Sequence, residues 1–230
     1  MTVVNAASGK PEIAPESLAL ITDLSLNLEP ESAGRIKDLP YTLAGVVVTV
    51  NNFPAQLRFV GNNEILFLVP RVPTRWLSGR FVTVEVRQIS QLPISTTVAF
   101  RPYSLGIYCI GNERTPECLP QGLYWARILP PSLIDESPVP LSRADIPVTV
   151  MLFVTGLRGA PKSDVKVSVC GASAQIVYVG PYPLIDGVDT VAFNLPTMRD
   201  KECLETKFIQ VTVGSHTANA VWLNLGEPRQ

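Results

Sequence analysis

The chain has 230 residues, 46% of them hydrophobic and 17% charged, and a formal net charge of -1. Enough apolar material is present for a packed core, which argues against disorder. The near-neutral charge provides no broad positive field for nucleic acid or anionic lipid, and no apolar run approaches the roughly 18 residues that span a bilayer. Nucleic-acid binding and membrane insertion are therefore not expected.

Short stretches of period-two alternation follow one another along the chain, divided by clusters of Gly, Pro, Asn and Asp. The 21 prolines are scattered between these stretches as all-β proteins place them. No amphipathic helix of three turns is expected. Strands are expected at residues 18–22, 46–50, 56–60, 65–69, 81–86, 96–100, 123–128, 148–154, 165–169, 175–179, 191–195, 208–213 and 220–225.

One passage of the first half is repeated in the second. The sequence "VTVNNFPAQLRFVGNNEILFLVP", residues 48–70, has a faint copy in "VSVCGASAQIVYVG", residues 167–180, followed by "VAFNLP", residues 191–196. The copy predicts two antiparallel β-sandwich domains, residues 1–103 and 104–230, with the boundary in "RPYSLG". A single large barrel is the alternative.

The overlay of the two copies also assigns inward and outward positions. The valines at 46, 48 and 50 match those at 165, 167 and 169 and should point into the core, and "FVTVEV" (81–86) matches "FIQVTV" (208–213). Leu66 and Leu68 fall on the outward side, where the second copy has Ala192 and Asn194. The first domain should therefore carry an apolar strip that the second domain, another strand or a missing neighbour covers.

Several passages resemble the uncharacterised Solibacter C-terminal domain family. They are "VVNAASGKPEIAPESLALI" at the start, "TLAGVVVTVNNFPAQLRFVGNNEILFLVP" in the first half, "LGIY" at the junction, and "VTGL" with "VKVSVCGASAQIVYVGPYPLIDGVDTVAFNLP" in the second half. The resemblance covers nearly the whole chain and implies tandem immunoglobulin-like sandwiches of the IPT/TIG type, at the C-terminal end of large exported bacterial proteins. It implies an extracellular, cell-surface or periplasmic location and no established function.

The four cysteines, Cys109, Cys118, Cys170 and Cys203, match no zinc pattern. Disulfides are the preferred interpretation and agree with export, whereas four thiols of a cytosolic protein remain the alternative. If successive strands are antiparallel, Cys170 and Cys203 lie at the same end of the second sandwich. Bridges from Cys170 to Cys203 and from Cys109 to Cys118 would close roughly 34 and ten residues, worth roughly 4 and 3 kcal/mol in the chain-entropy model.

Candidate chemistry is sparse, and no catalytic residue, metal site or cofactor is predicted. His216 lies in an expected hairpin turn, and the chain has no GxSxG nucleophile pattern for it to serve. Asp186 and Asp189 could be the paired carboxylates of a glycosidase, but a polar loop turning at Gly187 is the simpler interpretation. Two carboxylates are also few for calcium.

The most site-like stretch is "RVPTRWLSGR", which should share one end of the first sandwich with the turn at Asn51 and Asn52. Arginines beside a tryptophan can stack on a sugar or bind carboxylates. The candidate ligand-binding residues are Asn51, Asn52, Arg71, Arg75, Trp76 and Arg80.

We expect a non-catalytic exported structural, attachment or adhesion module that continues from upstream domains of a parent polypeptide. The alternative is an accessory domain that binds an extracellular glycan, peptide or protein through the Arg75 and Trp76 loop. A hydrolase is the weakest hypothesis.

Overall fold

The computed structural model describes residues 1–73, 80–89, 91–111, 118–126, 129–134, 139–140, 147–197, 208–223 and 225–226. The prediction of an all-β protein is confirmed: the described residues form β-strands and one turn of 3-10 helix, Lys162–Asp164, and contain no α-helix. The chain divides into two compact units. Unit 1 comprises residues 1–106, 155–158 and 181–188, and unit 2 comprises residues 107–154, 159–180 and 189–230.

Unit 1 thus contains two short segments from the second half of the chain. The expected division between residues 103 and 104 treated each domain as one continuous stretch. Residues 155–158 begin with the last residue of the long strand Val148–Thr155, and residues 181–188 are the segment "PYPLIDGV". Both segments contribute polar contacts to unit 1, which are described below.

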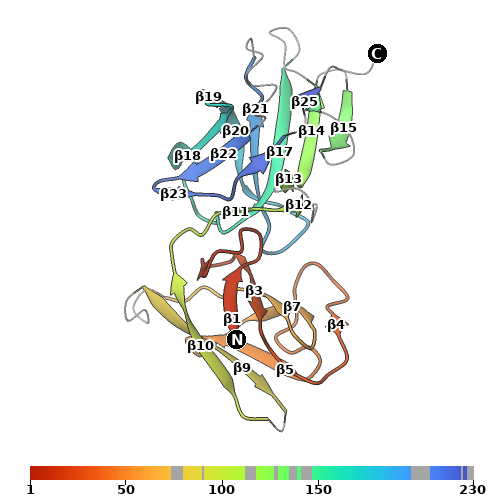
Figure 1. The fold of residues 1–230 in the computed structure, drawn as a ribbon, viewed down its shortest axis with the longest axis vertical. Helices are drawn as coiled ribbons and strands as arrows, with labels where there is room; N and C mark the ends of the chain where they lie inside the picture. Colours follow the sequence, from red (N-terminus) through yellow and green to blue (C-terminus); the bar gives the residue numbers. More distant parts are fainter. Residues whose placement is uncertain are drawn as a thin grey trace. The chain divides into compact units, whose positions relative to one another are not determined.

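Unit 1 has two five-stranded sheets, both seen in the red-to-yellow part of Figure 1. All neighbouring strands are antiparallel except β2 and β10, which run parallel. In spatial order, the first sheet contains β1 (Thr2–Asn5), β3 (Leu18–Thr22), β8 (Ile65–Leu68), β7 (Gln56–Val60) and β4 (Glu31–Ser32). The second contains β2 (Glu12–Ile13), β10 (Ile94–Phe100), β9 (Phe81–Gln88), β5 (Val46–Val50) and β6 (Phe53–Pro54).

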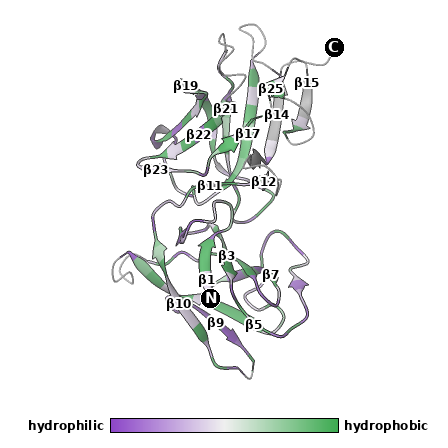
Figure 2. Ribbon diagram, viewed as in Figure 1, coloured by the Kyte–Doolittle hydropathy of each residue, from purple (hydrophilic) through white to green (hydrophobic). Residues whose placement is uncertain are grey.

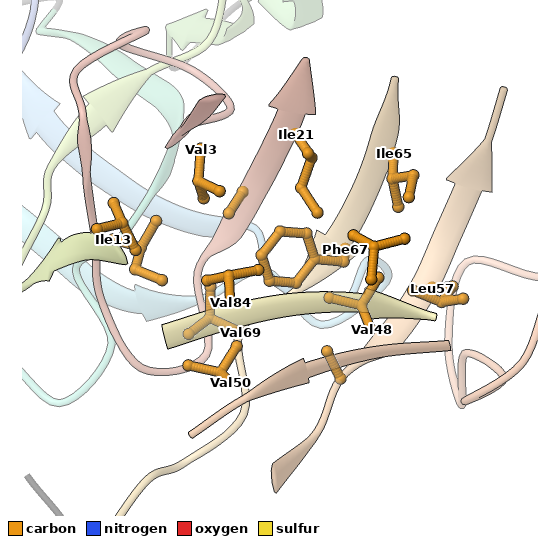
Figure 3. Packing of buried hydrophobic residues seen from close by; sticks show 14 of the residues in the cluster. Val3, Ile13, Ile21, Val48, Val50, Leu57, Ile65, Phe67, Val69 and Val84 are labelled. Carbon is orange, nitrogen blue, oxygen red and sulfur yellow. The ribbon is translucent and has the colours of Figure 1, made fainter. Parts of the chain in front are cut away.

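The inner faces of these two sheets form one hydrophobic core. Phe67 of β8 is fully buried, and Figure 3 shows its ring between the side chains of one sheet and those of Val48 and Val84 from the other. Strand β5 has four valines in five residues and is drawn as hydrophobic in Figure 2. Burial of each such side chain contributes about 1.5–3 kcal/mol, so this core is the main source of stability in unit 1.

Unit 2 repeats this arrangement with two main sheets and two small strand pairs. The first sheet contains, in order, β15 (Leu129–Leu133), β14 (Gly122–Ala126), β17 (Val148–Thr155), β21 (Asp189–Asn194) and β20 (Gln175–Pro181), with β11 (Gly106–Ile107) also pairing with β17. The second contains β19 (Ala172–Ser173), β18 (Val165–Val169), β22 (Phe208–Val213) and β23 (His216–Thr217), with β24 (Val221–Trp222) also pairing with β22. The small pairs are β12 (Cys109–Gly111) with β13 (Cys118–Pro120), and β16 (Val139–Pro140) with β25 (Leu225–Gly226).

The inward positions predicted from the repeat are confirmed. The valines of β5 at 46, 48 and 50 are fully buried, and those of β18 at 165, 167 and 169 are at most 3% exposed. The expected match between β9 and β22 is wrong by two residues, because Val48 pairs with Val86 whereas its counterpart Val167 pairs with Val211. A shift of two residues leaves every side chain on its original face, so the burial pattern agreed although the pairing did not.

The turns that follow β5 and β18 have the same backbone conformation. Asn51 and Asn52 have φ angles of 47° and 67°, and Cys170 and Gly171 have 51° and 80°. Positive φ at both central residues is the mark of a type I′ hairpin, for which Asn and Gly are the usual residues. Cys170 therefore occupies the same turn position as Asn51, where a residue other than Gly, Asn or Asp is uncommon.

The outward apolar strip of unit 1 is covered in part by the 181–188 segment. Gly187 lies so close to β3 and β8 that a Cβ atom there would be 2.6 Å from Leu18 Cγ and 2.8 Å from Leu68 Cδ1. Of the predicted strip, Leu66 and Leu68 are both half-buried. Of the covers that the sequence allowed for this strip, the structure thus shows a loop of the same chain.

Candidate functional site

The asparagine turn that we considered for binding has a structural use. The Oδ1 atom of Asn51 accepts a hydrogen bond from Thr83 N at 2.8 Å, and Asn51 N donates to Thr83 O at 2.8 Å. Both bonds attach the turn to β9 three residues after Arg80, so Asn51 and Arg80 lie at the same end of this sheet. The side-chain oxygen of Asn51 is therefore already engaged within the sheet.

The remaining candidates of this stretch are partly outside the described residues. Arg75 and Trp76 belong to residues 74–79, which the structure does not describe. Arg71 forms an ion pair with Glu16, Nε to Oε2 at 2.5 Å, with 77% of its side chain exposed. Arg80 is exposed, and its carbonyl oxygen accepts a hydrogen bond from Phe100 N at 2.7 Å.

Asp186 and Asp189 have different surroundings. The Oδ2 atom of Asp186 accepts a hydrogen bond from Asp38 N at 2.9 Å, and Asp186 N donates to Ile36 O at 3.1 Å. Asp186 therefore ties the loop at residues 36–38 to the 181–188 segment inside unit 1. Asp189 begins β21 in unit 2 and is 1% exposed. The glycosidase hypothesis gains no support from this arrangement.

His216 begins β23 and pairs with Val213 across the hairpin that joins β22 to β23. Its side chain is half-buried. The sequence predicted a hairpin turn at His216; the structure places the turn at Gly214 and Ser215, so His216 is the first residue of the strand that follows it.

The most polar part of the interior was missed as a site by the sequence reasoning. Four polar residues of unit 1, named here the buried polar centre, are completely inaccessible to solvent: Asn5, Ser17, Ser104 and Thr155. A buried polar group is costly unless it is hydrogen-bonded, so each of them needs partners. Two of these residues lie in stretches that are distinctive in the sequence: Asn5 in the opening "NAAS" and Ser104 in the boundary stretch "RPYSLG".

Asn5 uses both ends of its amide. Its Oδ1 atom accepts hydrogen bonds from Ala7 N and Ser8 N, each at 2.9 Å, and its Nδ2 atom donates to Ser104 O at 2.5 Å. Gly106 is packed against it, because a Cβ atom there would lie 2.4 Å from Asn5 Oδ1. The opening motif therefore folds as a turn around one asparagine and holds the end of the first half of the chain.

Thr155 has an equivalent role between three segments of unit 1. Its hydroxyl accepts a hydrogen bond from Leu18 N at 2.8 Å and donates to Gly187 O at 2.7 Å. The next residue, Gly156, accepts a hydrogen bond from Ser104 N at 3.0 Å through its carbonyl oxygen. The buried polar centre thus provides hydrogen-bond partners for backbone groups at strand ends, and the contacts described for it are all made within unit 1.

The cysteine predictions are only partly within reach of the described residues. Cys109 and Cys170 are each disulfide-bonded, and no described cysteine is a free thiol. Cys203 and the side chain of Cys118 lie outside the described part of the chain. The two pairings therefore stay predictions.

Three further observations bear on function. Within the described residues, no group of three or more His, Cys, Asp or Glu side chains could hold a metal ion. Over the same ranges, no helix is long and apolar enough to cross a membrane. No protein-family model and no curated protein matches the chain.

Proposed function

We propose that the chain is a non-catalytic attachment or adhesion module of an exported protein, built from two tandem immunoglobulin-like sandwiches. The observation that carries this proposal is the use of polar groups in its most distinctive stretches. In three of these stretches a side-chain oxygen accepts a hydrogen bond from a backbone N–H group of the same unit: Asn5 in the opening motif, Asn51 in the repeated turn and Asp186 in the inserted loop. Distinctive residues of this kind serve the fold, as expected of a spacer or attachment domain.

The strand order supports the immunoglobulin-like assignment. In that fold, strands A, B, E and D form one sheet and C, F and G the other. If β1, β3, β5, β7, β8, β9 and β10 are strands A to G, the two sheets of unit 1 read A-B-E-D and G-F-C. With β14, β17, β18, β20, β21 and β22 as strands A to F, unit 2 reads A-B-E-D and C-F, with β23 and β24 in the place of G.

Export is supported by the cysteines, because structural disulfides persist in oxidising compartments. Peptide mapping of the protein without reduction should show the pairs Cys109 with Cys118 and Cys170 with Cys203. Four alkylatable thiols in the native protein, purified from its own cells, would contradict export. An upstream signal peptide and large ectodomain in the full reading frame would favour attachment, whereas a stand-alone reading frame would weaken it.

The alternative is an accessory domain that binds a glycan or peptide at the end of unit 1 where Asn51 and Arg80 lie. Glycan and peptide arrays should be probed with the wild type, Trp76→Ala and Tyr41→Ala. Tyr41 is a suitable control because it is a described aromatic residue of the same unit with 54% of its surface exposed. No wild-type binding to any ligand would support the attachment role, whereas binding lost in Trp76→Ala alone would favour the accessory domain.

A further inference from the structure

The two units differ at one sheet edge. In unit 1 the strand β7 is not an edge, because Glu31 and Ser32 of β4 pair with Val60 and Phe59. In unit 2 the corresponding strand β20 ends its sheet, and no described strand lies beyond it. The reason is the length of the preceding connection. Residues 23–45 link β3 to β5 in unit 1 and supply β4, whereas residues 156–164 link β17 to β18 and form only a short 3-10 turn.

The outward side of β20 can be identified from its hydrogen bonds. In an antiparallel strand the N–H and C=O groups of one residue point to the same side, and successive residues alternate. Gly180 O accepts a hydrogen bond from Thr190 Oγ1, which places Gly180 on the side of β21. The backbone groups of Gln175, Val177 and Val179 therefore point to the open edge.

The side chain of Lys162 lies on this open edge. Lys162, in the 3-10 turn, donates from Nζ to Val177 O at 3.0 Å. Val177 and Tyr178 beside it remain 47% and 45% exposed. A lysine on an exposed edge strand is a known protection against pairing with another chain, because its charge and bulk must be displaced first.

We propose that β20 is a site for strand addition that accepts β20 of a second copy of this chain, and that Lys162 keeps it closed. The proposal goes beyond the attachment role and does not depend on it. An antiparallel pair centred on Val177 of each copy matches the outward residues of one strand with those of the other, Gln175 opposite Val179. About six backbone hydrogen bonds result, two for each pair of facing residues.

The exposed side chains favour a second copy as the occupant. Across this two-fold axis Val177 faces Val177 and Tyr178 faces Ile176, so the central cross-strand pairs consist of aromatic and β-branched residues. A single added strand buries less than the roughly 1,200 Å² of a standard interface. Pairing should therefore be weak in the wild type and strengthened when Lys162 is removed.

The test is sedimentation velocity on the wild type, Lys162→Ala and Lys166→Ala over about 1 µM to 1 mM, a range that covers weak association. Lys166 is the matched control, because it is an exposed lysine of β18 in the same unit. Lys162→Ala should dimerise about tenfold more tightly than the wild type or more, since each copy loses one charged hydrogen bond that pairing must break. Equal behaviour of all three proteins, or equal gains in both variants, would overturn the proposal.

Hydrogen exchange locates the interface. The backbone amides of Gln175, Val177 and Val179, which point to the open edge, should gain protection as the Lys162→Ala concentration rises. Adding Val177→Lys should remove both dimer and protection, and it is expected to fold because this side chain is half exposed. Protection elsewhere would overturn the proposal. A second outcome would also overturn it: Lys162→Ala stays monomeric, and β20 becomes protected only when a synthetic peptide copying residues 29–34 is added. The edge would then accept a strand like β4 and not a second copy of β20.

Discussion

Removing the hydroxyl of Thr155 tests whether hydrogen bonds from the second half of the chain stabilise unit 1. Thr155→Val keeps the shape of this fully buried side chain but leaves Leu18 N–H and Gly187 C=O without their partner. An unsatisfied buried group costs about 1–3 kcal/mol, so with two such groups unit 1 should lose about 2–6 kcal/mol of unfolding free energy. Thr155→Ser keeps the hydroxyl and removes one methyl group, which costs about 1 kcal/mol.

Urea unfolding should be combined with hydrogen exchange at the Leu18 amide, because a chain of two units need not unfold in one step. The Leu18 amide should exchange faster in Thr155→Val and nearly as in the wild type in Thr155→Ser. The packing view ranks the variants in the opposite order, since valine retains the volume. A serine variant less stable than the valine variant would refute the hydrogen-bond explanation.

Three further outcomes are expected. Asn5→Ala should cost at least about 3 kcal/mol in urea unfolding, because two backbone N–H groups and one C=O lose their bonds. A loss below about 0.5 kcal/mol, typical of a surface change, would contradict this role. Gly156→Ala should prevent stable folding, because φ at this residue is 78° and the new Cβ would lie 1.9 Å from a backbone oxygen. Gly34→Ala is the control: its new Cβ meets nothing within 4 Å, so thermal melts should show a variant that folds like the wild type. A hydrogen bond from Thr2 lowers the pKa of the exposed Asp23 carboxyl. The small stabilisation from this carboxylate is therefore present above its unfolded pKa and is lost as the pH falls through its folded pKa. An NMR titration of Asp23 should give a higher midpoint in Thr2→Ala than in the wild type, and an unchanged midpoint would count against that bond.

The strand pattern could be predicted because alternation is a local property. Strands β3 and β7 begin and end at the predicted residues, and the inward valines of β5 and β18 are buried as expected. The two-residue error between β9 and β22 has the same cause. A period of two is unchanged by a shift of two, so only the hydrogen-bond partners distinguish the registers.

The candidate site was less predictable. The sequence indicated that Asn51 and the stretch before β9 share one end of a sandwich, and the bonds of Asn51 to Thr83 place it there. It did not indicate that the Asn51 side chain would be consumed by a backbone N–H, because a turn asparagine can equally face solvent. Arg75 and Trp76 stay candidates for the alternative function only.

The features that the sequence pattern did not predict depend on contacts between residues far apart in the chain. Period-two alternation, turn residues and an internal copy were sufficient for the all-β class and for the inward faces, since each depends on near neighbours in the chain. The buried polar centre, the cover of Gly187 over Leu68 and the closing of β7 by β4 depend on which distant segments meet. An outward leucine or a polar serine is the same in sequence whether a loop covers it or water does. Its meaning is settled only by the chain segment that packs against it.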